Sequence, residues 1–146
     1  MIDIKTGVRL SKEEVLNLLV YFDDSSEHPL HDGLDFETYS IKLSQYANFI
    51  LAYSSGKYVG FIAYYLNTEG KFVYIPQIVV HKSKRHQGVG HCMFGALVSR
   101  YSIAYSTVKL EVLRENMNAI NFYTREGFTK IEDREERLYL EKELGG

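Results

Sequence analysis

The sequence has almost no cysteine and no long apolar run, and these absences narrow the classes of protein it can belong to. Cys92 is the only cysteine among 146 residues, which excludes an intramolecular disulfide framework and fits a reducing compartment. No stretch approaches the roughly 18 apolar residues that a bilayer-spanning helix needs. Residues 1–5 lack the apolar segment of a secretory signal. We therefore expect a cytoplasmic protein with no membrane partner.

The sequence also lacks a large excess of either positive or negative charge. The net charge is −2, so nothing in the overall composition favours binding to nucleic acid or to an anionic membrane. Apolar residues make up 45% of the chain, which is enough for one hydrophobic core at this length, and we expect a single domain over residues 1–146. The densest basic cluster, residues 81–86, is therefore a local feature. A solvated loop is one explanation, but the glycine pair that follows favours a binding site.

Hydrophobic periodicity predicts four helices and six strands, the first three strands forming an antiparallel meander. Ser11 and Glu14 have the spacing of a capping box at the start of one helix, and Asp35 is expected to cap the next. Pro76 stands inside a predicted strand, where its lack of an N–H predicts a break in pairing with one neighbour. The two N-terminal helices are followed by strands at 49–53, 58–65 and 72–80, a helix at 88–100, a strand at 107–112, a helix at 118–125, and strands at 128–131 and 138–140.

The turn Arg85–Gly90 is the most informative segment, because it joins the strand 72–80 to a helix. The first backbone N–H groups of a helix have no internal partner, and the helix dipole adds positive charge at that end. Phosphate groups bind readily at such a terminus. Gly88 and Gly90 carry no side chain, so a phosphate can approach the backbone closely. The turn therefore predicts a site for a phosphorylated cofactor.

Two ordered motifs resemble those of the GNAT acetyltransferase superfamily. Arg85-x-x-Gly88-x-Gly90 after a strand is similar to its acetyl-CoA signature. The second motif begins with a strand and consists of Val108, Leu110, Val112, Asn116, Ala119, Phe122, Tyr123, Gly127 and Phe128. Finding both motifs in the expected order is much rarer by chance than finding either alone. The resemblance covers residues from about 48 to 140, and the N-terminal third fits the family only in outline.

The resemblance implies an α/β (α+β) fold, with a mixed, twisted sheet of about six to seven strands flanked by about four helices. Two central strands splay apart in this fold, and the pantetheine arm of acetyl-CoA lies in the gap. The resemblance thus implies acetyl-CoA as co-substrate and no metal. Asn116 is expected either to bind the cofactor or to cap the following helix. The residues expected to bind the cofactor are Ile78, Val79, Val80, Arg85, His86, Gln87, Gly88, Val89, Gly90, His91, Asn116 and Tyr123.

Acetyl transfer to an amine needs a neutral amine, a polarised carbonyl and a proton for the departing thiolate. Tyr123 matches the family's tyrosine near the sulfur, so the resemblance makes it the catalytic acid; a tyrosine of the core is the alternative. The base is left open, because the strand 72–80 contains no carboxylate where many relatives carry a glutamate. The candidates are Glu111, His81 and a carboxylate within residues 23–35.

The resemblance implies an enzyme, an N-acetyltransferase that moves an acetyl group to a primary amine of a small molecule or peptide by direct attack. Analogy also suggests a homodimer. The acidic segment 23–32 borders the acceptor site in such a fold and would favour a cationic or hydroxyl-rich amine. The alternative is a non-catalytic acyl-CoA-binding or sensor module, which the missing carboxylate supports. An acetyl group carried by Cys92 is a weaker possibility, and no standard zinc pattern matches the spacing of His81, His86, His91 and Cys92.

Overall fold

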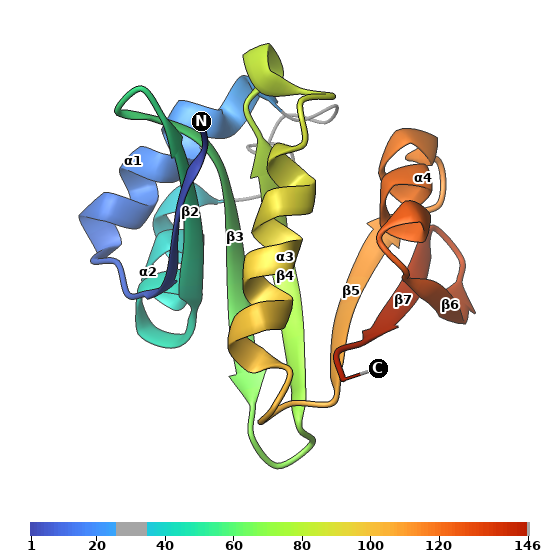
Figure 1. Cartoon of the computed structure of the whole chain (residues 1–146). Helices are drawn as coiled ribbons and strands as arrows, with labels where there is room; N and C mark the ends of the chain where they lie inside the picture. Colours follow the sequence, from blue (N-terminus) through green and yellow to red (C-terminus); the bar gives the residue numbers. More distant parts are fainter. Residues whose placement is uncertain (26–34, 146) are drawn as a thin grey trace.

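The computed structural model describes residues 1–25 and 35–145, which form a seven-stranded mixed sheet with helices on both faces (Figure 1). The strand order is β1-β2-β3-β4-β5-β7-β6. Only β4 and β5 pair in parallel. The strands are β1 (Asp3–Val8), β2 (Asn48–Ser54), β3 (Lys57–Asn67), β4 (Phe72–Val80), β5 (Thr107–Leu113), β6 (Thr129–Arg134) and β7 (Arg137–Glu143). The helices are α1 (Lys12–Phe22), α2 (Phe36–Tyr46), α3 (Val89–Tyr101) and α4 (Met117–Arg125), with short 3-10 turns η1 (Asp23–Ser25) and η2 (Lys82–Lys84).

The predicted elements are confirmed, with one strand added and one hairpin lengthened. β1 was not expected, because its sequence alternates weakly; it is an edge strand that pairs with β2 from Asp3 to Val8. At the other edge the predicted turn 132–137 shrinks to two residues, since β6 and β7 continue through its charged positions. Charged side chains are common on edge strands, where they face water.

Helix ends follow the sequence signals. The Ser11 hydroxyl accepts from the Glu14 amide at 3.2 Å, and the Glu14 carboxylate accepts from the Ser11 amide at 2.9 Å. The predicted capping box is therefore confirmed. Asp35 caps α2 by accepting from the Glu37 amide at 3.0 Å.

The sheet is covered on both faces, so β3 is buried on both sides. Phe61 and Ala63 face the cluster formed with α1 and α2, whereas Ile62 and Tyr64 face the cluster formed with α3. Alternation along a strand sends successive side chains to opposite faces, which explains why β3 is apolar almost throughout. No helix among the described residues combines the length and apolarity needed to cross a bilayer.

β4 and β5 pair over only part of their length. Their ladder runs from Phe72 opposite Thr107 to Ile75 opposite Leu110, and no pairing follows. The next residue of β4 is Pro76, which has no N–H to donate, and the register with β3 also shifts opposite it. Beyond this point the two strands diverge, as Figure 1 shows. The predicted splay is confirmed, and pairing changes on both sides of Pro76 rather than on one.

Candidate active site

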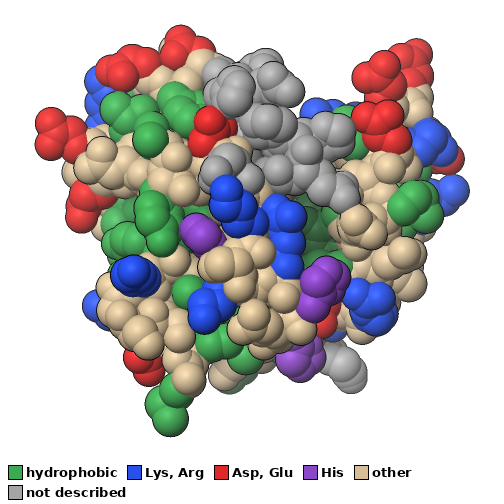
Figure 2. All heavy atoms as spheres, turned by 90° about the horizontal axis from the view of Figure 1, so that it is seen from above, with side chains coloured by type: hydrophobic (Ala, Val, Ile, Leu, Met, Phe, Trp, Pro, Cys, Tyr) green, Lys and Arg blue, Asp and Glu red, His purple; other side chains and the backbone are tan. Residues whose placement is uncertain are grey.

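An open groove of about 630 Å³ lies where β4 and β5 diverge, between the N-terminus of α3 and the helix α4. Figure 2 looks into this hollow, which is rimmed by basic and histidine side chains. Of the twelve residues predicted to bind the cofactor, all but Gln87 line the groove; the side-chain Nε2 of Gln87 instead donates to the Ser83 carbonyl at 3.3 Å. The eleven are Ile78, Val79, Val80, Arg85, His86, Gly88, Val89, Gly90, His91, Asn116 and Tyr123.

One end of the groove is suited to an anion. The first intrahelical hydrogen bond of α3 runs from the Cys92 amide to the Gly88 carbonyl at 3.0 Å. The amides of residues 89–91 therefore have no acceptor within the helix. Gly88 is the N-cap with a φ of 85°, which favours glycine, and no side chain caps the helix. Lys84 and Arg85 line the same end, so positive charge and free donors meet there.

Gly90 is also required by packing. A Cβ atom at this position would lie 2.7 Å from Cζ of Phe122, nearer than side chains approach each other. Phe122 belongs to α4, so this helix rests directly on the first turn of α3. His91 strengthens the contact, because its Nδ1 lies 2.8 Å from the Glu126 carboxylate. The two walls of the groove are thus joined at its mouth.

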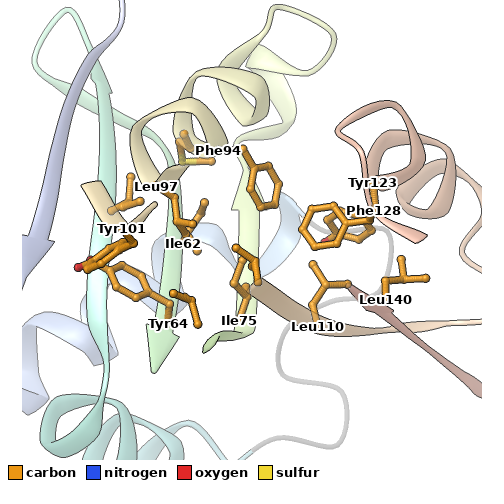
Figure 3. Close-up of a cluster of buried hydrophobic side chains, with 14 of the residues drawn as sticks. Ile62, Tyr64, Ile75, Phe94, Leu97, Tyr101, Leu110, Tyr123, Phe128 and Leu140 are labelled. Atoms are coloured by element: carbon orange, nitrogen blue, oxygen red, sulfur yellow. The ribbon is translucent and has the colours of Figure 1, made fainter. Parts of the chain in front are cut away.

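Tyr123 belongs to an aromatic cluster that bridges the two halves of the sheet (Figure 3). Its ring centroid lies 6.2 Å from that of Phe94 on α3 and 5.6 Å from that of Phe128. Tyr123 is 8% exposed, and burial raises the pKa of its phenol well above the ordinary value. No hydrogen bond to its hydroxyl is formed within residues 1–25 and 35–145. The groove therefore contains a neutral phenol free to donate.

Both ends of α4 are fixed by local signals. Asn116 caps the start, its side-chain oxygen accepting from the Ala119 amide at 3.2 Å, so capping is the role that the structure gives it. Gly127 follows the end of the helix, with a φ of 99°. The Gly127 amide donates to the Thr124 carbonyl at 3.1 Å and the Phe128 amide to the Tyr123 carbonyl at 3.0 Å. This pair of bonds is a Schellman motif, and it anchors the backbone of Tyr123 itself.

Glu111 lies on the other face of the sheet. Its neighbours Leu110 and Val112 pack in the same cluster as Tyr123, so alternation sends Glu111 to the opposite side. Leu110 is the last β5 residue paired with β4, which puts Glu111 at the start of the splay. Its carboxylate accepts a hydrogen bond from the Tyr74 hydroxyl at 2.7 Å. Glu111 does not line the groove.

Two of the other candidate bases, His81 and Asp35, have structural roles. The Nδ1 atom of His81 accepts from the Ser83 amide at 3.2 Å and thereby caps η2. The His81 ring also packs on Tyr21, with centroids 5.5 Å apart. Asp35 is the cap of α2. Most of the acidic segment 23–32 lies outside the described residues.

Several lining residues were not predicted, above all Lys84, Asn118, Phe122, Arg125 and Glu126. The four on or next to α4 have spacings of four, three and one, so they share one face of a helix. That spacing could have identified them once α4 was known to face the cofactor. Cys92 is exposed and does not line the groove. Among the residues that the structure describes, no group of three or more metal-binding side chains converges.

Comparison with known proteins identifies the family. A family model described as the acetyltransferase (GNAT) family matches residues 15–128. The chain belongs to the GNAT acetyltransferase family. It is therefore an acyltransferase, as the two motifs predicted.

Several solved structures share its fold. The *Escherichia coli* ribosomal-protein-S18-alanine N-acetyltransferase has a TM-score of 0.79 at 16% identity, over 100% of this chain and 96% of that one. The PaiA N-acetyltransferase of *Thermoplasma acidophilum*, solved with coenzyme A, has a TM-score of 0.78 at 17% identity, over 98% and 99%. PH1933 from Pyrococcus horikoshii OT3 has a TM-score of 0.76 at 24% identity, over 98% of this chain and 98% of that one. No curated protein sequence matches significantly.

The contact between Gly90 and Phe122 can be tested by stability. We expect Gly90→Ala to lower the free energy of unfolding by about 1–3 kcal/mol, the usual cost of overpacking, in urea denaturation. Adding Phe122→Leu should recover part of the loss. Gly95 is the matched control, because it lies in the same helix with nothing within 4 Å of a Cβ, so Gly95→Ala should stabilise by up to about 1 kcal/mol. Equal stability of Gly90→Ala and the wild type would contradict the contact.

Proposed function

We propose that the protein is an N-acetyltransferase that uses acetyl-CoA and transfers the acetyl group to a primary amine of a small molecule or peptide by direct attack. The observation that carries the proposal is a single groove with an anion-binding helix terminus at one end and a buried neutral phenol beside it. Family membership and the fold shared with a coenzyme A complex support acetyl-CoA as the co-substrate. The name of the *E. coli* enzyme gives an alanine of a ribosomal protein as its acceptor, which supports including peptide amines.

The cofactor would lie along the groove in an extended conformation. The free amides of residues 89–91, with Lys84 and Arg85, would bind the diphosphate. The pantetheine arm would run beside Ile78–Val80, a part of β4 with no ladder partner on the β5 side. Unpaired strand groups in this segment are the donors and acceptors that the amides of pantetheine need. This arrangement would bring the sulfur near Tyr123.

Tyr123 would act on the departing sulfur. Negative charge grows on the sulfur as the carbon–sulfur bond breaks, and a neutral phenol donates a hydrogen bond to it. A thiol has an ordinary pKa near 8.5 and a phenol near 10. Because burial raises the pKa of Tyr123 further, complete proton transfer to the thiolate is uphill. Hydrogen bonding in the transition state is therefore its main contribution, with proton transfer following as the products separate.

Glu111 would accept the proton of the attacking amine. It lies at the start of the splay on the face opposite Tyr123, so an amine that approaches from that face meets a carboxylate before it reaches the thioester. Since Glu111 does not line the groove, contact is made from outside or through one water. His81 and Asp35 already serve as caps, which favours Glu111 over these two.

The proposal as a whole is tested by binding and turnover together. We expect calorimetry to detect coenzyme A binding, and acetyl-CoA to release free thiol when alanyl peptides, polyamines or amino sugars are supplied. Absence of coenzyme A binding would contradict the proposal. Binding without thiol release for any amine would favour the non-catalytic acyl-CoA sensor instead.

Tyr123→Phe isolates the phenol. We expect kcat to fall by about ten- to a thousand-fold, within the range of one acid–base contribution, while the Kd for coenzyme A stays nearly constant. The wild-type pH profile should show no loss of activity from Tyr123 ionisation below its ordinary pKa of 10.0, because the folded pKa is higher. Tyr105→Phe is a matched control outside the groove. Unchanged turnover in Tyr123→Phe would remove this residue from the mechanism.

Glu111→Gln tests the base while it preserves an acceptor for Tyr74. We expect kcat/KM to fall by about 100- to 10,000-fold near neutral pH. The deficit should shrink as pH rises, because bulk solvent then supplies the neutral amine. Glu141→Gln is the control, since Glu141 lies on the same face of the neighbouring strand β7. A deficit that is absent, or that is the same at every pH, would argue against a base at this position.

A further inference from the structure

β4 contains no carboxylate, but it contributes a residue that contacts one. Tyr74 of β4 lies opposite Lys109 of β5 in the parallel register. Glu111, two positions on, is therefore the next β5 residue on the same face. The Tyr74 hydroxyl donates to Oε2 of Glu111 at 2.7 Å, and both side chains are half-buried. This bond crosses between the two strands close to the point where they separate.

Tyr139 is a second tyrosine beside Glu111, and its hydroxyl is held by Arg134. Tyr139 of β7 lies opposite Glu111 in the antiparallel register. Its hydroxyl accepts from the Arg134 guanidinium at 3.0 Å, and Arg134 also pairs with Glu132 at 2.9 Å. Burial, followed by the nearby Glu111 carboxylate, raises the pKa of Tyr139. Glu111 thus lies between two protonated phenols, one from each flanking strand.

We propose that Tyr74 is a positioning residue for acetyl transfer, which fixes one carboxylate oxygen of Glu111 so that the other is presented to the acceptor amine. The inference rests on the proposed function. A free glutamate side chain samples many rotamers, and ordering one of them costs conformational entropy. The phenol holds the carboxylate before the amine arrives. Burial and the bond to Glu111 raise the pKa of Tyr74 well above its ordinary value, so Tyr74 remains a donor wherever the enzyme would work.

A double-mutant cycle tests this role with wild type, Tyr74→Phe, Glu111→Gln and the double variant. We expect Tyr74→Phe to lower kcat by about 10- to 100-fold, the range for losing a hydrogen bond to a charged group, with little change in the KM for acetyl-CoA. In the Glu111→Gln background the same substitution should change kcat by no more than about twofold, because Tyr74 acts through Glu111. A role in general stability would instead give the same loss in both backgrounds.

Tyr65→Phe is the matched control. Tyr65 lies opposite Tyr74 on β3, and its buried hydroxyl has no hydrogen-bond partner among the described residues, so its removal should leave kcat unchanged. Urea unfolding and coenzyme A affinity show whether Tyr74→Phe is folded. If the wild type is active, two results would overturn this inference alone. In one, Tyr74→Phe leaves kcat unchanged; in the other, Tyr74→Phe lowers kcat by the same factor in the wild-type and Glu111→Gln backgrounds. A wild type that releases no thiol with any amine defeats it together with the proposed function.

Discussion

The structure depends on a sheet that stops pairing halfway along its two central strands. Backbone groups in a sheet interior are normally paired, since an unpaired buried amide or carbonyl is costly. Here the β4–β5 ladder ends at Ile75 and Leu110, where Pro76 supplies no donor. The unpaired length of β4 then becomes one wall of a groove, and α4, which follows β5, forms the other. A ligand with amide groups of its own is the natural partner for such walls.

A sheet divided in this way must be held together elsewhere, and side chains do this. Phe94 of α3 packs on Phe122 and Phe128, with centroids 5.8 and 5.4 Å away. The Gly90 contact and the pair of His91 with Glu126 add to this bridge at the mouth of the groove. Tyr123 lies inside the same cluster. The packing that connects the halves therefore also fixes the phenol proposed to act on the sulfur.

Local signals in the sequence were sufficient for much of the fold. The caps at Ser11 and Asp35 and the glycine turn depend on residues within a few positions of each other, so pattern alone identified them. Pro76 was informative for the same reason. β1 was missed because its alternation is weak and it is held by pairing with β2, about 45 residues later in the chain.

Features that depend on strand register could not be predicted. Tyr74 and Glu111 are separated by 37 positions, and only the parallel pairing of β4 with β5 brings them together. Phe122 meets Gly90 for a similar reason, so the sequence suggested phosphate access for this glycine and not a packing contact. Glu111 was one of three open candidates for the base. The caps formed by His81 and Asp35 favour Glu111 over these two, and most of the segment 23–35 lies outside the described residues.

The most direct measurement is a crystal structure with acetyl-CoA bound. The account predicts the diphosphate on the free amides of residues 89–91, the pantetheine arm between β4 and β5, and the sulfur within hydrogen-bond reach of the Tyr123 hydroxyl. A diphosphate bound away from the start of α3, or a sulfur remote from Tyr123, would contradict it.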